Sequence, residues 1–326
     1  MGFLSHLKDK FSDRHGQNEQ NEDDLPPQWA PAPEKSVKWY PYGILMPLIT
    51  GQYHNGKLAD ATDDEYTSAE KFCVEFPPQP PRLLPSAAVD RIKEVGAKAW
   101  EIEYPQTSRF VGSITNPSEA KGGPSVCKVE TNAKCKDICL MSNLPLMAGM
   151  YDGRGKKGFY YEILIKRMDG LVAIGEPYPV WRLPGWNRLS AGLHLDDLRK
   201  FFEDPDGGRD YTEALTQVSS GDTVGCGYEF TSGALFFTYN GQRLANAFTG
   251  IYLPRHNHDV FAAIGVEGRN DFEINFGAEL FRWKEGNEWA WLTEGSVGGQ
   301  MSGGPSDAGD ELPSYNDANS STAFTY

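Results

Sequence analysis

The chain has 326 residues and a formal net charge of −14 at pH 7. An acidic balance of this size argues against binding to a nucleic-acid backbone, which requires clustered Lys and Arg side chains. Hydrophobic residues make up 39% of the chain, which also contains 35 Gly and 8 Trp. This composition is typical of many short strands joined by tight turns. We therefore expect an all-β protein without a nucleic-acid partner.

The cysteines and the apolar runs bear on compartment and cofactors. The 5 cysteines are odd in number and lack the C-x-x-C spacing of zinc or redox sites. The longest apolar run, residues 43–49, is much shorter than the roughly 20 residues that cross a bilayer. No pattern of a secretory leader precedes it. The sequence therefore predicts a cytoplasmic protein without a bound metal or cofactor.

Residues 1–36 are predicted to form a disordered tether. Residues 1–14 place Phe3, Leu7 and Phe11 on one face of a short amphipathic helix. Such a segment is either a terminal helix that frays in solution or a weak peripheral membrane contact. Residues 16–36 are rich in Asn, Gln, Asp, Glu and Pro and are too polar to pack into a core.

Residues 37–139 are expected to form a flank that packs on the main domain. A Pro-rich stretch at residues 77–81 precedes Ser86, a residue type that caps helices. Apolar residues at helical spacing follow it, at Val89, Ile92 and Val95. We expect one short helix here.

Beyond Trp100 the apolar pattern has a period of two, which indicates half-buried strands. Strands are expected at residues 160–166, 171–175, 223–230, 234–239, 260–265 and 272–276. Asn240-Gly241 separates two apolar runs and predicts a hairpin with a type I′ turn. No helix of crossover length separates the strands, so the sheets should be antiparallel.

A series of motifs resembles the SPRY family. The central one is Gly225-Cys226-Gly227 within residues 221–230, followed by residues 233–241. Its companions occur in the order of that family, at residues 158–163, 173–175, 184–186, 262–265 and 273–277. The resemblance covers residues 140–283. It implies a two-sheet antiparallel β-sandwich of the concanavalin-like jelly-roll type.

The resemblance also implies that the chain binds a protein partner through loops at one end of the sandwich. The candidate contacts are Tyr151, Arg154, Trp181 and Arg182, with residues 252–258 as a further segment. Trp and Arg are enriched among residues that anchor interfaces. An alternative for Trp181 is a loop residue folded back on the sandwich. The insertion at residues 195–211 departs from the compact family pattern and is expected to reshape this surface.

Residues 284–326 are rich in Gly, Ser, Asp and Asn and are predicted to form a disordered tail. Within it, Leu312-Pro313-Ser314-Tyr315 is an LPxY motif, a variant of the ligand of WW domains. A SPRY domain followed by such a tail resembles the fungal endosomal and vacuolar adaptors that bring a HECT-type ubiquitin ligase to membrane cargo. That resemblance implies a peripheral location at an endosomal or vacuolar membrane.

Two other functions stay open at this point. A general SPRY scaffold would not use the LPxY motif at all. A glycan-binding or glycan-cleaving sandwich would need two carboxylates about 5–10 Å apart, and the insertion supplies Asp196, Asp197, Glu203, Asp204 and Asp206. A run of charges is more often a solvated face, and His256 and His258 have no third metal-binding partner in their motif. We therefore expect no enzymatic activity.

Overall fold

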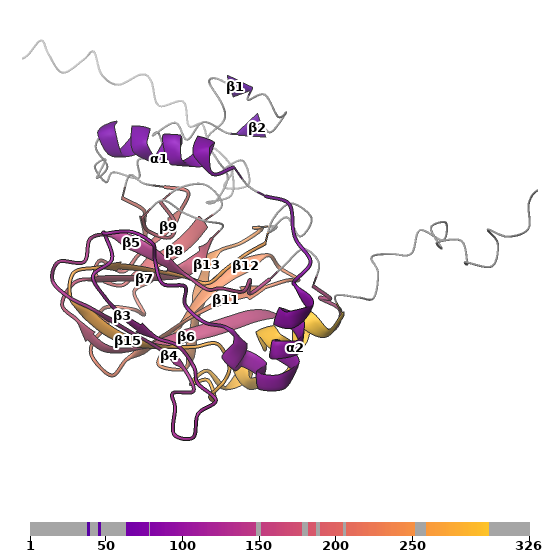
Figure 1. Ribbon diagram of the computed structural model, residues 1–326. Helices are drawn as coiled ribbons and strands as arrows, with labels where there is room; N and C mark the ends of the chain where they lie inside the picture. Colours follow the sequence, from indigo (N-terminus) through magenta and orange to yellow (C-terminus); the bar gives the residue numbers. More distant parts are fainter. Residues whose placement is uncertain are drawn as a thin grey trace, which may run out of the picture.

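The protein is a sandwich of two antiparallel sheets, shown by a computed structural model (Figure 1). The structure describes residues 38–39, 45–46, 63–77, 79–147, 151–177, 182–186, 190–204, 207–251 and 259–299. One sheet has seven strands in the order β13-β12-β11-β6-β15-β4-β3, and the other has six in the order β10-β9-β8-β7-β14-β5. The predicted all-β sandwich is confirmed.

The seven-stranded sheet consists of β3 (Gly112–Thr115), β4 (Cys127–Thr131), β6 (Gly158–Met168), β11 (Thr223–Glu229), β12 (Ala234–Tyr239), β13 (Gln242–Phe248) and β15 (Asn270–Asn275). The six-stranded sheet consists of β5 (Ile138–Met141), β7 (Leu171–Pro177), β8 (Ser190–His194), β9 (Arg199–Phe202), β10 (Arg209–Asp210) and β14 (Ala263–Glu267). The helices are α1 (Asp63–Glu75) and α2 (Ser86–Val95), with 3-10 helices η2 (Gly96–Ala99), η3 (Lys284–Asn287) and η4 (Thr293–Gly299). A short pair, β1 (Lys38–Trp39) and β2 (Leu45–Met46), precedes them.

The core lies between the sheets and follows the alternation of apolar residues. On β6, Tyr161, Ile163 and Ile165 are fully buried on the inner face. Burying a large apolar side chain contributes about 1.5–3 kcal/mol. The hydroxyl of Tyr161 crosses the core and donates to the carbonyl of Gly175 on β7 at 2.6 Å. The buried hydroxyl is thereby satisfied and ties the two sheets together.

The predicted hairpin is also confirmed. Asn240 and Gly241 have φ values of 50° and 82°, which a type I′ turn requires at both central residues. Tyr239 of β12 pairs with Gln242 of β13 directly across the turn.

The flank completes the sandwich rather than only packing on it. It provides β3 and β4 to one sheet and the start of β5 to the other, so the predicted boundary at residue 140 cuts through β5. Trp100 is fully buried. Ile102 bridges to Ser142 beyond the end of β5, and the Asn116 amide exchanges two hydrogen bonds with the backbone of Ile102, at 2.9 and 3.0 Å. The segment around Ile102 therefore closes one open side between the sheets.

The insertion closes the opposite side. Its strands β9 and β10 extend the six-stranded sheet beyond β8. Lys200, on β9, is buried and donates to the carbonyl of Ala247 on β13 at 2.7 Å. The hydroxyl of Tyr211 donates to the carbonyl of Ala245 on the same strand. Two side chains of the insertion thus cap the outer edge of β13.

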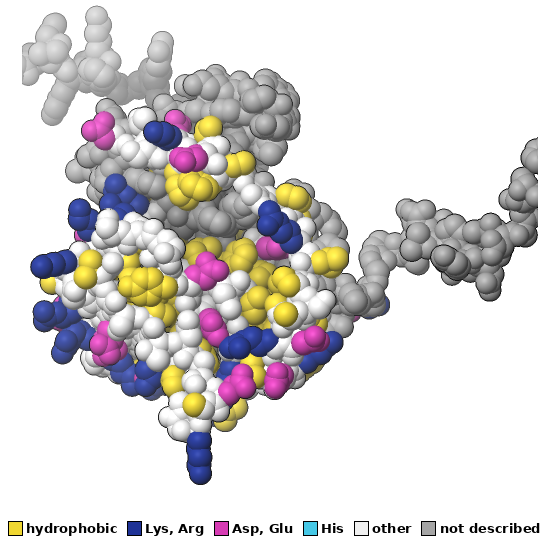
Figure 2. Space-filling model, viewed as in Figure 1, with side chains coloured by type: hydrophobic (Ala, Val, Ile, Leu, Met, Phe, Trp, Pro, Cys, Tyr) yellow, Lys and Arg dark blue, Asp and Glu magenta, His cyan; other side chains and the backbone are white. Residues whose placement is uncertain are grey.

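The helices agree only in part with expectation. The predicted helix is α2, but Pro85 precedes its first residue, Ser86, and no side chain caps it, so the expected Ser cap is wrong. Helix α1 was not anticipated from its acidic sequence. Among the described side chains of α1 only Ala69 is buried, and Phe76, directly after the helix, is exposed. Figure 2 shows hydrophobic side chains along the lower side of this helix.

The predicted tail begins too early. Residues 280–299, here named the C-terminal strap, cross the outer face of the seven-stranded sheet. Trp283 and Trp291 are buried and form a second apolar cluster with Tyr160 and Phe236 from that face. Each indole has an edge-to-face contact with Phe236 at 5.3 or 5.6 Å. The aromatic residues inside the Gly-rich sequence are the reason that the strap is ordered. Residues 300–326 lie outside the described residues.

Candidate partner-binding surface

Three of the candidate loops leave the sandwich at the same end. They follow β5, β7 and β13. β5 and β7 both end beside the start of β14, and β13 ends at the same end of its sheet as the start of β6. Tyr161, near the start of β6, bonds to Gly175, near the end of β7, so the three strands end at one end of the sandwich. We call this the loop end. Trp181 and residues 252–258 lie outside the described residues.

Tyr151 has an inward structural contact. Its hydroxyl donates to the carbonyl of Pro145 at 3.2 Å, and the indole N–H of Trp100 donates to the same carbonyl, also at 3.2 Å. Burial and the nearby carboxylate of Asp259 raise the pKa of Tyr151 well above its ordinary value. The hydroxyl therefore stays protonated and holds the loop after β5 against the buried Trp100.

Arg154 lies in the same loop and is exposed. Its guanidinium makes hydrogen bonds to both carboxylate oxygens of Asp152, at 2.9–3.2 Å. These hydrogen bonds lower the pKa of Asp152 to about 2. The Arg154 side chain is 78% exposed, so the Asp152–Arg154 pair presents a planar cation and an anion at the surface of the loop end. Such planar bidentate groups give directional contacts to a partner.

Arg182 forms an ion pair at the opposite end of β5 from the loop that contains Arg154. Its Nη1 atom lies 3.2 Å from Oδ2 of Asp137, and Arg109 binds the other oxygen of the same carboxylate. Asp137 directly precedes β5, whereas Arg154 follows that strand. The structure therefore does not bring Arg182 together with Tyr151 and Arg154. Arg182 also has a positive φ of 69°, a backbone conformation that is uncommon outside glycine.

The residues after Arg182 fold back over the six-stranded sheet. Leu183 is buried, and a methyl group added at Gly265 on β14 would lie only 2.7 Å from its side chain. The carbonyl of Pro184 lies 3.0 Å from Nε2 of His194 on β8. A carbonyl only accepts, so this nitrogen carries the proton. Burial lowers the pKa of His194 to about 4, and the ring stacks on Phe201 at 3.9 Å.

Asp197 and Glu203 of the insertion lie at opposite ends of β9. Asp197 lies in the turn before β9 and accepts a hydrogen bond from the backbone of Arg199 at 2.9 Å. Glu203 follows β9 at the other end of that strand. Burial raises the pKa of Asp196, but Asp206 and the two His residues of 252–258 lie outside the described residues. Within the described ranges, no three potential ligand side chains converge as a metal site.

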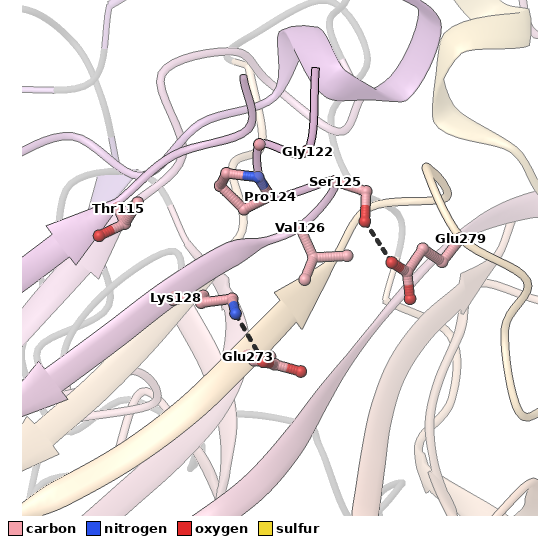
Figure 3. A pocket seen from close by; sticks show the side chains of 9 residues that line it. Thr115, Gly122, Pro124, Ser125, Val126, Lys128, Glu273 and Glu279 are labelled. Carbon is pink, nitrogen blue, oxygen red and sulfur yellow. Dashed lines mark hydrogen bonds and ion pairs between the residues drawn. The ribbon is translucent and has the colours of Figure 1, made fainter. Parts of the chain in front are cut away.

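A cavity that the sequence did not indicate lies on the outer face of the seven-stranded sheet (Figure 3). It has a volume of about 390 Å³ and is bounded by the hairpin loop between β3 and β4. Lys128 and Glu273 form its floor, 3.4 Å apart, and Ser125 donates to Glu279 at its wall. Lys128 and Glu273 alternate with buried residues along their strands, a pattern that also describes any solvated sheet face, and Ser125 and Glu279 lie in loops, so no sequence signal distinguished these residues.

Comparison with known proteins decides the family of the central region. Residues 158–279 match the SPRY domain family. They are a SPRY domain. The predicted resemblance is thus confirmed. The SPRY domain contains β6 to β15, whereas β3, β4, β5 and the whole C-terminal strap lie outside the matched residues.

Fungal proteins share a larger part of the chain. The protein named Protein ssh4 of Sclerotinia sclerotiorum is 29% identical over 245 residues, which are 72% of this chain and 41% of that protein. The Protein ssh4 of Neurospora crassa is 29% identical over 242 residues. A SPRY domain-containing protein of Schizosaccharomyces pombe is 32% identical over 50% of this chain and 40% of its own length. The chain thus spans about two fifths of the relatives it matches.

The solved structures that resemble the chain include a human SPRY domain. It has 24% sequence identity and a TM-score of 0.36, and the match covers 47% of this chain and 93% of that structure. Among the helices that the structure describes, none is both long and apolar enough to cross a bilayer.

Proposed function

We propose that the chain is a non-catalytic adaptor that binds a protein through its SPRY domain and a WW-domain HECT ubiquitin ligase through its tail. The bound protein is proposed to be membrane cargo in endosomal or vacuolar sorting. The observation that carries the proposal is the combination of a SPRY domain, related over 72% of the chain to fungal Ssh4 proteins, with the LPxY motif at residues 312–315.

The loop end supplies the proposed cargo contacts. Arg154 is the strongest of the four candidate residues because it is exposed and held in a fixed geometry by Asp152. Tyr151 supports this surface indirectly, since its hydroxyl is bonded within the domain. Arg182 is ion-paired with Asp137 at the other end of β5 and does not contribute to it. Trp181 belongs to the same loop as Arg182 and is proposed as an aromatic contact.

The proposed ligase contact is Leu312, Pro313 and Tyr315. WW domains accept an extended Pro-containing turn in an aromatic groove. The strap ends at Gly299, and residues 300–311 separate it from the motif. A segment of this length spans at most roughly 40 Å. A ligase bound at the motif would therefore be kept close to the end of the strap.

A binding titration tests the ligase contact. The full chain is titrated with an isolated WW domain of a HECT ligase, and Tyr315→Ala is compared with Tyr326→Ala, which removes a Tyr outside the motif. We expect Tyr315→Ala to abolish binding and Tyr326→Ala to retain it. Equal binding by the two variants, or no binding by the unchanged chain, would reject the adaptor and leave a SPRY scaffold without ligase recruitment.

A further inference from the structure

The outer strands of the two sheets differ in how their edges are covered. β13 is capped by the side chains of Lys200 and Tyr211. Beside β5, the backbone N–H of Glu103 donates to the carbonyl of Met141 at 2.9 Å. β10 has only 2 residues. β3 is the last strand of its sheet. Among the described residues, hydrogen bonds on its far side occur only beyond its end, between Asn116 and Ile102.

The register shows which backbone groups of β3 point to this open edge. The N–H of Asn132 donates to the carbonyl of Val111 at 3.1 Å, so these residues form a hydrogen-bonded pair with β4. Such pairs alternate along antiparallel strands. Ser113 and Thr115 therefore bond to β4, whereas Gly112 and Ile114 direct their N–H and C=O groups outward. No described residue bonds these outward groups. An edge of this kind accepts another strand.

The charges beside β3 indicate the chemistry of that strand. Glu130 on β4 lies directly opposite Asp271 on β15, and both side chains face outward. Like charges directly opposite each other destabilise a sheet. Arg167 on β6 lies opposite Asp271 on its other side, but its guanidinium ion-pairs with Asp169 at 3.8 Å. No cation of the described part of the chain lies within ion-pair distance of either carboxylate. In the next row, by contrast, Glu273 is balanced by Lys128 at 3.4 Å and Lys166 at 3.5 Å.

We propose that β3 receives an extended, basic segment of a partner protein as an eighth strand of this sheet. A residue of that segment opposite Ser113 would direct its side chain to the outer face. Neighbouring strands are about 4.8 Å apart, so Glu130 lies two strand spacings away, across the small Ser113 side chain. An extended Lys or Arg covers this distance together with the Glu130 side chain and neutralises the Glu130–Asp271 pair.

The cavity lies at the other end of the same edge. Thr115 of β3 is part of its lining, and Glu279 forms a wall (Figure 3). A side chain two residues along the added strand, opposite Thr115, would be directed toward this cavity. The edge strand and the cavity thus form one continuous surface. This surface contains none of the candidate residues Tyr151, Arg154, Trp181 and Arg182 and does not include the LPxY motif, so the inference is independent of the proposed function.

A labelled peptide in which Lys alternates with Val and Thr tests the proposal on the full chain. We expect saturable binding at low salt and slower amide exchange at Gly112 and Ile114 in the complex. The variant Glu130→Gln with Asp271→Asn should bind about tenfold more weakly, because it removes both carboxylates that the basic side chain would neutralise. The matched control, Glu70→Gln with Glu94→Gln, removes the same charge from α1 and α2 and should bind normally.

Backbone pairing is tested by N-methylation of every second residue of the peptide. Two peptides are compared, one methylated at the odd positions and one at the even positions. Methylation keeps the charge, but only one of the two peptides loses the N–H groups that would bond to Gly112 and Ile114, so only that peptide should lose binding. No binding of the unmodified peptide, equal weakening in both pairs of variants, or unchanged exchange at the two amides would each overturn the proposal. A concentration-dependent dimer that protects the same amides would also overturn it, in favour of a second copy.

Discussion

The carboxylate of Glu162 on β6 accepts hydrogen bonds from the backbone N–H of Arg282, at 2.9 and 3.2 Å, across 120 residues of sequence. The hydroxyl of Tyr160 donates to the same carboxylate at 3.0 Å. Burial raises the pKa of Glu162, and the backbone donors act in the opposite direction. One buried carboxylate therefore fixes the start of the C-terminal strap to the outer face of the seven-stranded sheet.

Replacing Glu162 by Gln should loosen the strap. The amide provides one acceptor oxygen where the carboxylate provides two, and its NH₂ group would face backbone or hydroxyl donors. Leaving a buried donor unsatisfied costs about 1–3 kcal/mol. We expect a loss of this size in the free energy of unfolding in urea, together with faster amide exchange at Arg282. Glu119→Gln, on the exposed hairpin loop, is the control and should leave both unchanged.

The buried His194 predicts a dependence of stability on pH. Its pKa is lowered to about 4 from an ordinary value of 6.5. Between these values the unfolded chain binds a proton that the folded chain does not, so stability falls as the pH decreases from 6.5 to 4. At pH 5 the loss attributable to this residue is about 2 kcal/mol relative to pH 7.5.

Urea unfolding at the two pH values measures this effect. His194→Phe keeps a ring that can stack on Phe201 and removes the titrating group, so its stability should change less between pH 7.5 and 5 than that of the unchanged chain. An identical pH dependence in both proteins would show that other groups are responsible.

The Arg182–Asp137 ion pair should couple the loop after β7 to the edge of β5. Both side chains are partly shielded, with exposed fractions of 23% and 15%. A double-mutant cycle with Arg182→Ala and Asp137→Ala should give a coupling energy of about 1 kcal/mol. Amide exchange at Leu183 and Gly185 should become faster in each single variant. A coupling energy of zero would mean that packing of Leu183 alone holds the loop.

Local patterns accounted for the elements whose chemistry is contained in a few neighbouring residues. The Asn240-Gly241 dipeptide predicted the turn, because Asn and Gly readily adopt the positive φ values that both residues have in the structure. The alternation of Tyr161, Ile163 and Ile165 predicted β6. The family motifs placed the remaining strands of the SPRY domain in order.

The parts that could not be predicted depend on contacts between distant segments. Trp100 and Trp291 appear in polar or Gly-rich surroundings, and nothing near them in the sequence reveals which sheet they cover. The separation of Arg182 from Arg154 depends on Asp137, a partner 45 positions away from Arg182 in the sequence. The cavity beside β3 is formed by single residues of β3, β4 and β15 together with the loop between β3 and β4 and Glu279. In each strand alone these residues look like a solvated face.

Truncation at two positions tests where the folded unit ends. A chain that stops after residue 299 keeps every described element of the strap. It should unfold with the same free energy as the full chain. A chain that stops after residue 283 loses Trp291, which is 2% exposed and packs against Phe236 and Trp283. Removing a buried Trp side chain costs about 3–5 kcal/mol, and the exposed Phe236 and Tyr160 would favour aggregation.

Thermal and urea unfolding of the two truncated chains, with Trp291→Ala in the full chain as a third protein, separates the possible causes. We expect Trp291→Ala to reproduce most of the loss seen on truncation after residue 283, because the indole fills the space above Phe236. If truncation after residue 283 left the unfolding free energy unchanged, the strap would not contribute to the stability of the sandwich. The folded unit would then end close to residue 279, where the match to the SPRY domain family ends.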